Sequence, residues 1–274
     1  MGALVEDRSY PSVKSSKIAE SIIIPVPPLE VQREIVRILD NFTELTAELT
    51  AELTARRKQY EYYRDNLLSF DETTPSKTVG EISSYRRGSF PQPYGNKEWY
   101  DGEGAMPFVQ VADIGDNMRL VSDTKRKISK IAQKKSVFAP KGSIVISLQG
   151  SIGRIAVIQY DAYIDRTVAI FQDISTEVLE RYFVYQLQRI FGIKEKTARG
   201  STIKTITKEE FTDFPIAVPS IKEQQRIVRI LDQFECLCND LTSGLPAEIE
   251  ARQRQYEFYR DRLLTFKEKE NADE

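Results

Sequence analysis

Residues 26–40 read VPPLEVQREIVRILD and residues 218–232 read VPSIKEQQRIVRILD, so one stretch occurs twice in the chain, 192 positions apart. Each copy continues into a polar segment and closes on a nearly identical phrase, QYEYYRDNLLSF ending at Phe70 and QYEFYRDRLLTF ending at Phe266. A repeat with this period indicates a duplicated module rather than a short solenoid unit. The segment between the two copies is therefore expected to carry the specific function.

Apolar side chains recur in both copies at intervals of three and four residues. This spacing predicts two long helices whose apolar rows pack along a coiled-coil seam. Pro27 and Pro219 precede the first helical turn, where a missing N–H group costs little. The residues expected along the helix–helix seam are Ile35, Ile38, Phe42, Leu45, Ile227, Ile230, Phe234 and Leu237.

The first copy contains a smaller repeat, in which the tetrapeptide TAEL begins at Thr46 and again at Thr50. Each TAEL unit spans about one helical turn and uses alanine and glutamate, which favour helix. Adding four residues lengthens a helix by about 6 Å, so the run is expected to act as a spacer of adjustable length. A plain solvated rod is the alternative. The spacer residues are Thr46, Leu49, Thr50 and Leu53.

The segment between the copies contains short runs of strand-forming residues, which are separated by turn residues. They predict strands at residues 108–111, 143–148, 154–158 and 167–171. A helix with an apolar stripe is expected to follow, capped by Ser175 and ended by Gly192. The expected fold class is α+β, with one mixed α/β domain carried on two long antiparallel helices that form a coiled coil.

The repeat also predicts domain boundaries, because Ser9–Ile24 corresponds to Ser201–Ile216, the end of the middle segment, when shifted by 192 positions. The chain is therefore expected to begin with the last piece of a second, absent domain. The expected divisions are 1–24 for this remnant, 25–70 for the first helix with its TAEL spacer, 71–78 for a linker, 79–216 for the mixed domain, 217–266 for the second helix and 267–274 for a polar tail.

Composition excludes several kinds of catalytic site. The chain contains no histidine, which excludes Ser-His-Asp and Cys-His hydrolases and histidine-ligated zinc. The two cysteines, Cys236 and Cys238, are expected to be plain thiols, and no metal site is expected. No apolar run approaches the roughly 20 residues of a membrane helix, and the first residues lack the pattern of a signal peptide, so a cytoplasmic protein is expected.

The middle segment is locally basic, although the whole chain carries a formal net charge of −2. Residues 75–215 contain 21 lysine and arginine residues against 16 acidic residues. This distribution favours an interaction with nucleic acid. Polar, glycine-rich connections supply side chains that bind base edges and phosphates, although a simple turn or a solvated face is the alternative for each. The candidate DNA-contacting residues are Arg86, Arg87, Tyr94, Lys97, Lys125, Arg126, Lys127, Gln149, Ser151, Arg154, Arg199, Ser201 and Lys204.

Several features of the sequence together resemble a known family. They are the duplicated helix starts, the paired phrases QYEYYRDNLL and QYEFYRDRLL, the TAEL turns, and the phrases SLQGSIGRIAV and RGSTIKTITKEEF. Over essentially the whole chain, the sequence is similar to the specificity (S) subunits of type I DNA restriction-modification systems, in the branch with variable numbers of TAEL. That family usually joins two target recognition domains through two antiparallel helices, and each domain reads half of a split DNA sequence. Here the resemblance implies one complete recognition domain with both helices.

The resemblance implies a non-catalytic, DNA-binding subunit that docks an adenine methyltransferase (M) subunit and, through it, an endonuclease (R) subunit. S-adenosylmethionine, Mg²⁺ and ATP are then expected on the partner subunits, and this chain is expected to hold no cofactor. The sequence agrees, because it contains neither an Asn/Asp-Pro-Pro-Tyr/Phe motif nor a Gly-x-x-x-x-Gly-Lys-Ser/Thr loop.

Two other functions are the alternatives. The first is a coiled-coil scaffold without DNA specificity. The second is a metal-dependent nuclease built on Asp113, Asp123 and Lys125. Because a two-fold dimer matches a palindromic DNA site, a homodimer of two single-domain chains is a further expectation.

Overall fold

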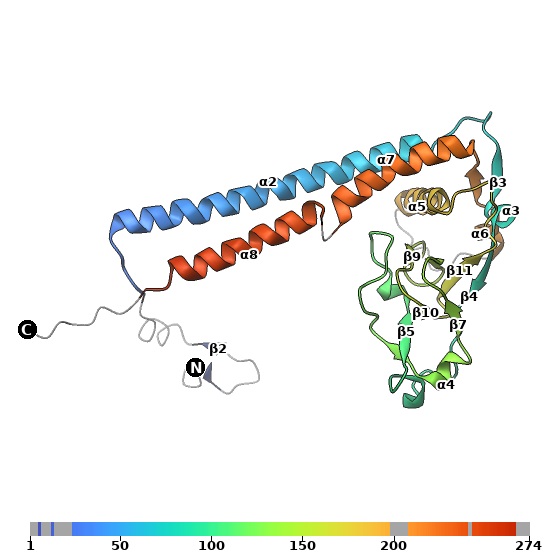
Figure 1. The fold of residues 1–274 in the computed structure, drawn as a ribbon, viewed down its shortest axis with the longest axis horizontal. Helices are drawn as coiled ribbons and strands as arrows, with labels where there is room; N and C mark the ends of the chain where they lie inside the picture. Colours follow the sequence, from blue (N-terminus) through green and yellow to red (C-terminus); the bar gives the residue numbers. More distant parts are fainter. Residues whose placement is uncertain (1–4, 7–11, 14–23, 198–207, 241–242, 267–274) are drawn as a thin grey trace, which may run out of the picture. The chain divides into compact units, whose positions relative to one another are not determined.

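A computed structural model describes residues 5–6, 12–13, 24–197, 208–240 and 243–266 (Figure 1). The described residues divide between two compact units. One unit is formed by Met1–Glu52 with Ala247–Glu274, and the other by Leu53–Pro246. We describe each unit by itself.

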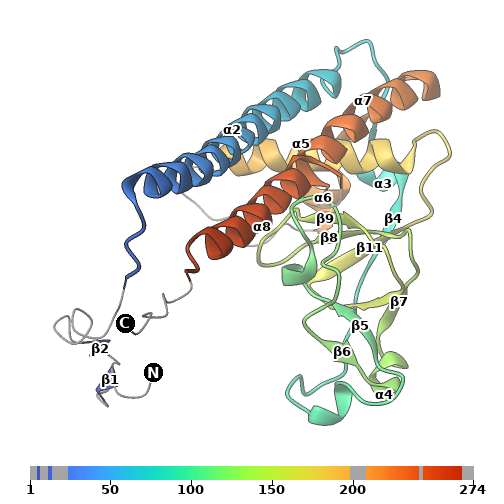
Figure 2. The ribbon, with the colours of Figure 1, turned by 60° about the vertical axis from the view of Figure 1, so that its left-hand side comes forward.

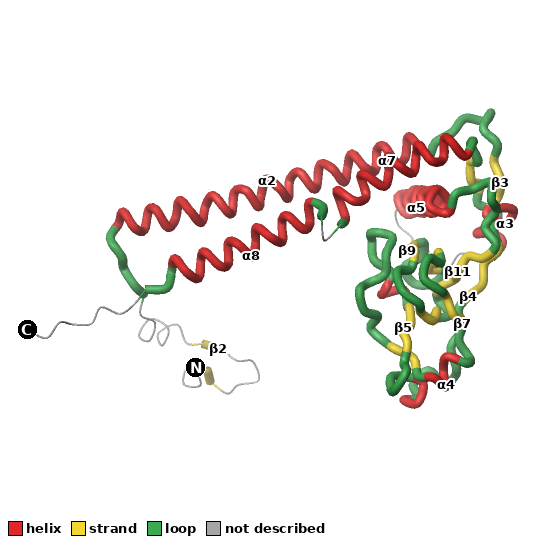
Figure 3. Tube along the Cα trace, in the orientation of Figure 1, coloured by secondary structure: helices red, strands yellow, loops and turns green. Residues whose placement is uncertain are grey.

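Helix α2 (Leu29–Leu67) has 39 residues and contains the whole TAEL run without a break (Figure 3). Its start follows the two prolines, and the side-chain amide of Gln32 donates to the Pro27 carbonyl at 2.7 Å. Within the TAEL run, the hydroxyls of Thr46 and Thr50 donate to the carbonyls four residues earlier, at 2.8 and 2.7 Å. These hydroxyls are therefore satisfied inside the helix.

The first unit pairs the N-terminal part of α2 with α8 (Leu245–Leu263). Phe42 of α2 stacks on Tyr259 of α8, with ring centroids 5.3 Å apart. Ile35 is buried, whereas Leu45, which was expected at the seam, is exposed because Thr46 and Leu49 occupy the less exposed side of the helix. The two short strands β1 (Val5–Glu6) and β2 (Ser12–Val13) pair antiparallel and belong to this unit.

The second copy of the repeat does not form the single helix expected over residues 217–266. It forms α7 (Ile221–Asn239) and α8, with a break between Asp240 and Gly244. A Cβ atom on Gly244 would lie 2.5 Å from the Cys236 carbonyl oxygen, so the chain turns where a larger residue does not fit. Pro246 then lies in the first turn of α8, the helical position that tolerates proline.

The second unit contains two four-stranded sheets, whose strands can be followed in Figures 1 and 2. The first sheet is antiparallel, in the order β4 (Ser84–Arg87), β11 (Val168–Gln172), β8 (Ile144–Ser147) and β9 (Ile155–Val157). The second has the order β6 (Lys127–Ile128), β5 (Met106–Val109), β10 (Ala162–Ile164) and β7 (Val137–Ala139). Here β5 and β10 are parallel. The four predicted strands correspond to β5, β8, β9 and β11, which confirms a mixed α/β domain.

The two ends of the mixed domain meet in a short antiparallel pair. Strand β3 (Ser76–Thr78) pairs with β12 (Pro215–Ala217), and the Val218 N–H donates to the Pro75 carbonyl at 2.7 Å. The remaining short elements are α3 (Val79–Ile82), η1 (Lys97–Trp99), η2 (Val111–Asp113), α4 (Lys130–Gln133) and α6 (Lys208–Thr212).

Helix α5 (Glu180–Thr197) begins later and ends later than expected. Ser175 lies in a turn that precedes the helix, where its carbonyl accepts from the Val178 N–H at 3.1 Å. Gly192 lies inside the helix and does not end it. Phe191 is buried just before Gly192, and beyond it Lys194 Nζ lies 3.9 Å from the Phe214 ring centroid, so contacts on both sides of the glycine accompany the extension. The side chains that α5 buries in this largest core cluster include Tyr182, Phe183, Val184, Tyr185 and Leu187.

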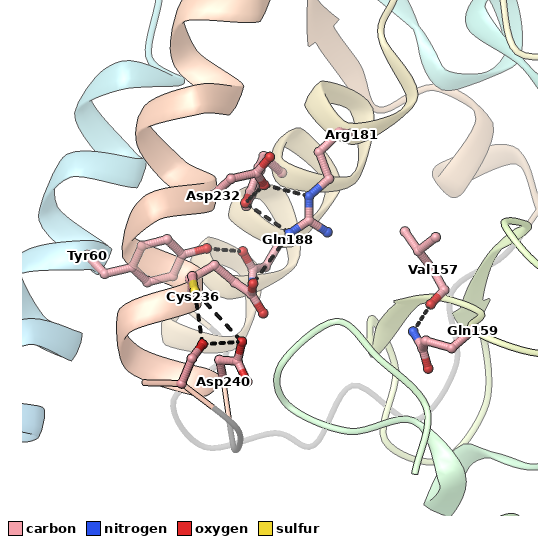
Figure 4. Close-up of polar contacts among 11 residues, drawn as sticks. Tyr60, Val157, Gln159, Arg181, Gln188, Asp232, Cys236 and Asp240 are labelled. Carbon is pink, nitrogen blue, oxygen red and sulfur yellow. Dashed lines mark hydrogen bonds and ion pairs between the residues drawn. The ribbon is translucent and has the colours of Figure 1, made fainter. Parts of the chain in front are cut away.

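A polar network fixes α5 to α7 (Figure 4). The Asp232 carboxylate of α7 accepts from Arg181 Nε at 2.8 Å and from the Tyr185 hydroxyl at 2.5 Å. Tyr60 of α2 donates to Gln188 at 3.0 Å. Burial raises the pKa of the Tyr185 phenol, and it raises the pKa of Glu235 although Arg181 lies 3.7 Å away. The mixed domain is thus attached to the helices of its own unit by directed, partly buried contacts.

Candidate DNA interface

A cluster of aromatic rings, which we call the ring cluster, packs around Phe90 in the mixed domain. It comprises Phe90, Tyr94, Trp99, Tyr100 and Phe108. The Phe90 centroid lies 4.6 Å from that of Tyr94, 5.3 Å from that of Tyr100 and 4.8 Å from that of Phe108. Both ribbon views place β5 and α4, which flank the cluster, at the end of the unit away from α5 (Figures 1 and 2).

A cationic side chain lies over each of three of these rings. Arg166 Cζ lies 5.6 Å from the Tyr94 centroid, Arg126 Cζ lies 4.8 Å from the Tyr100 centroid, and Lys135 Nζ lies 5.2 Å from the Trp99 centroid. All three cationic side chains are exposed. In the described part of the chain, no carboxylate forms an ion pair with any of them. Cations that are held on rings but not neutralised are suited to binding a polyanion.

Hydrogen bonds fix the rings that carry these cations. The Tyr100 hydroxyl donates to the Tyr94 carbonyl at 2.8 Å, and the Trp99 indole N–H donates to the Pro93 carbonyl at 3.2 Å. Gln110 Nε2 donates to the Tyr94 hydroxyl at 3.5 Å. The side chains above the rings are therefore held on a rigid base.

Of the predicted contact residues, Tyr94, Lys97 and Arg126 meet at or beside the ring cluster. Lys97 is exposed and lies in η1, two residues before Trp99. Lys125 and Lys127 flank Arg126, and Lys127 forms an ion pair with Asp123 at 3.2 Å.

Arg86 and Arg87 lie elsewhere, on the edge strand β4, where both are exposed. Because β4 pairs only with β11, one of its edges is free in the described part of the chain. The two arginines are adjacent in sequence, so their side chains point to opposite faces of the sheet. A single DNA surface is therefore expected to use one of them rather than both.

The connection between β8 and β9 holds the predicted residues Gln149, Ser151 and Arg154. Ser151 is exposed and Gln149 is partly exposed. Arg154 is engaged internally, because Nη1 donates to the Ile114 carbonyl at 2.8 Å and Nη2 pairs with Asp116 at 2.9 Å. This bracing role weighs against Arg154 as a residue that reads bases. The predicted contacts at Arg199, Ser201 and Lys204 lie outside the described residues.

The residues considered for a nuclease site have structural roles. Asp113 is fully buried, and its two carboxylate oxygens accept from the backbone N–H groups of Lys125 and Gln110, at 3.0 and 2.8 Å. Among the described residues, no group of three or more histidine, cysteine, aspartate or glutamate side chains is placed to hold a metal ion. These contacts give no support to the nuclease alternative.

Sequence reasoning missed Arg166 and Gln110, whereas Lys135 belongs to the basic group (Lys125–Lys127 with Lys130, Lys134 and Lys135) that the sequence offers for phosphate contact. The basic run around Lys125 pointed to part of the cluster, but Arg166 is a single arginine in a short turn between strands. Only the alternation of aromatic residues between Phe90 and Tyr100 could have suggested a ring platform for cations.

The family is identified by comparison with known proteins. A family model described as the type I restriction modification DNA specificity domain matches residues 8–56 and 74–251, which is more than half of the chain. The chain belongs to this family. The match includes residues 26–56 and 218–251 of the two repeat copies, together with the mixed domain and its ring cluster.

Individual relatives agree with this assignment. The specificity subunit of an Escherichia coli type I restriction enzyme is 39% identical over 258 residues, which cover 90% of this chain and 62% of the relative. A putative type I specificity subunit of Mycoplasma pneumoniae is 30% identical over 276 residues, which cover 96% of this chain and 78% of the relative. The chain therefore spans less than two thirds of the E. coli relative.

Solved structures support the fold. The HsdS subunit from Thermoanaerobacter tengcongensis matches with a TM-score of 0.56 at 22% identity, covering 94% of this chain and 64% of that chain. In the described part of this chain, every helix is too short or too polar to cross a membrane.

Proposed function

We propose that this chain is a non-catalytic specificity subunit of a type I restriction-modification enzyme, and that it directs a methyltransferase to one half-site of double-stranded DNA. The family match across the helices and the mixed domain carries this proposal. The unneutralised cations on the ring cluster support it, because a surface that binds the phosphate backbone requires such charges.

The two copies of the repeat are proposed to form an antiparallel coiled coil that docks the M subunit and, through it, the R subunit. The stacking of Phe42 on Tyr259 supports such a helix pairing in one unit, and the stacking of Tyr63 on Phe234 at 5.4 Å supports it in the other. S-adenosylmethionine, Mg²⁺ and ATP belong to the partner subunits in this proposal. The complex acts on DNA in the cytoplasm.

A second copy of this chain is proposed to supply the second half-site. The described part of the chain contains one mixed domain. A two-fold pair of such chains reads a symmetric site. Light scattering of the DNA complex tests this part, since a strict monomer in every complex contradicts it.

Co-expression with the cognate methyltransferase subunit, followed by sequencing that detects methyladenine, tests the proposed function. The expected result is methylation at one recurrent DNA sequence that depends on both proteins. Removing the cations together, as Arg126→Ala with Lys135→Ala, should weaken DNA binding and lower methylation. A chain that folds and binds the methyltransferase but leaves methylation random or absent contradicts the proposal.

A further inference from the structure

Hydrogen bonds to the residues before and after Arg166 fix the backbone of the turn that contains it. Asp165 is buried, and one of its carboxylate oxygens accepts from the Thr167 N–H at 2.9 Å and from the Thr167 hydroxyl at 2.7 Å. The Val168 N–H donates to the Asp165 carbonyl at 2.9 Å, which closes the turn. Arg166 is thus the exposed residue of a turn whose two neighbours are held in place.

The same turn joins the two sheets, because it leads from β10 into β11. The Asp165 N–H donates to the Val109 carbonyl beside β10, and the Thr167 carbonyl accepts from the Leu148 N–H, both at 3.0 Å. Gly88 approaches so closely that a Cβ atom there would lie 2.2 Å from the Ile164 carbonyl oxygen. The backbone at position 166 therefore has little freedom to move.

The side chain of Arg166 is also oriented. Its guanidinium lies over Tyr94, whose ring packs on Phe90 and whose hydroxyl accepts from Gln110. In the described part of the chain, Arg166 has no carboxylate partner. An arginine whose guanidinium contacts a ring and has no carboxylate partner has lost part of the rotamer freedom that binding would otherwise remove.

We propose that Arg166 reads a guanine of the half-site through the major groove. The fork of an arginine matches the O6 and N7 acceptors of guanine, and this pairing is the commonest specific contact between proteins and DNA. A phosphate contact needs charge alone, whereas the fixed turn and the contact of the guanidinium with the Tyr94 ring favour one direction of the side chain, which is what base reading requires. Arg126 and Lys135 then serve the phosphates nearby. This inference rests on the proposed function and adds a base and a residue to it.

The unaltered protein provides the first test. Once the methylated sequence is known, DNA duplexes are made in which each guanine of the half-site in turn is replaced by 7-deazaguanine, which lacks the N7 acceptor. With the complex of this chain and its methyltransferase, replacement at one guanine should weaken binding by less than about 150-fold, the upper limit for a whole bidentate base contact, because 7-deazaguanine keeps the O6 acceptor. A half-site without guanine on either strand, or equal binding of every 7-deaza duplex, overturns the proposal.

A variant assigns the contact to the residue. Arg166→Met keeps the turn but removes every N–H donor of the side chain. It should lose the preference for the guanine identified by 7-deazaguanine, and 7-deazaguanine should then have no further effect at that position. Arg119→Met serves as the matched control, since Arg119 is an exposed arginine of the same unit whose charge acts on Glu235, and it should leave every base preference unchanged.

The remaining outcomes are also decisive. If Arg166→Met keeps the full guanine preference, or if it weakens all duplexes equally, Arg166 reads no guanine and the proposal fails. Equal thermal melting of the variant and the unaltered protein shows that a lost preference is not lost folding. Failure of the proposed function looks different, because the unaltered complex would then methylate no recurrent sequence at all.

Discussion

Removing one TAEL unit should shorten the DNA spacer between two half-sites without changing the half-sites themselves. Deletion of Thr46–Leu49 joins Leu45 to Thr50 and leaves one intact TAEL unit in a continuous helix. Four residues at about 1.5 Å each shorten α2 by about 6 Å, and their loss rotates the C-terminal part of the helix by about 40° beyond one full turn. A shift of this size corresponds to one or two base-pair steps of about 3.4 Å.

The assay is methylation mapping of cells that express the methyltransferase subunit with either form of the chain. We expect the non-specific spacer to contract by one or two base pairs. The half-site sequence should stay unchanged, because the mixed domain reads it and the deletion does not alter that domain. Inserting a further TAEL unit should lengthen the spacer by the same amount.

A length-preserving variant separates length from sequence. Thr46→Ala with Thr50→Ala removes both hydroxyls but keeps all 39 residues of α2, so the spacer should stay unchanged. Circular dichroism should show the same helix content in the parent and in this control. A changed half-site with an unchanged spacer, or a spacer shift in the length-preserving control, refutes the reasoning.

Three further predictions concern stability and charge. Burial raises the pKa of Glu235 above its ordinary value of about 4.5, so ionisation of this carboxyl group destabilises the folded state as the pH rises. Glu235→Gln should therefore raise the melting temperature at pH 7 and leave it unchanged at pH 4. Gly244→Ala should lower unfolding free energy by about 1–3 kcal/mol in chemical denaturation, because its Cβ would meet the Cys236 carbonyl oxygen, and an unchanged midpoint would contradict the close approach. Arg126→Ala should reduce the slope of log binding constant against log salt concentration by about 0.9, as measured by fluorescence anisotropy, whereas an unchanged slope would show that Arg126 makes no phosphate contact.

The sequence predicts the long elements best, since their signal repeats along many residues. Helix α2 is predicted by apolar side chains at intervals of three and four residues, and β8 is predicted by a continuous apolar run that is buried at all four positions. The limits of α5 were wrong because a glycine ends a helix only when the packing beyond it does not favour continuation. The break before α8 was missed because the apolar spacing continues across it, while Gly244 and Pro246 act locally.

The candidate site was predicted in part for a related reason. Arg126 belongs to a basic run that is visible in the sequence, whereas Arg166 is brought to Tyr94 by the pairing of β5 with β10, strands that are more than 50 residues apart. Pairing between distant strands depends on tertiary packing, which local patterns do not contain. At Arg154 the sequence pattern predicts a DNA contact, but in the structure the side chain of this arginine forms hydrogen bonds within the protein that hold a loop in place.

The contacts around Arg166 also indicate how base preference and folding can be separated in this domain. The turn is held by Asp165, Thr167 and the close approach of Gly88, and none of these contacts uses the Arg166 side chain. A substitution at position 166 therefore removes one exposed group and leaves the hydrogen bonds of the turn intact. Substitution of Asp165 has the opposite effect, since it frees the backbone of the turn and loosens the junction of the two sheets. We therefore expect variants at position 166 to change the base that is read at nearly constant melting temperature, and Asp165→Ala to lower the melting temperature and weaken binding to all sequences.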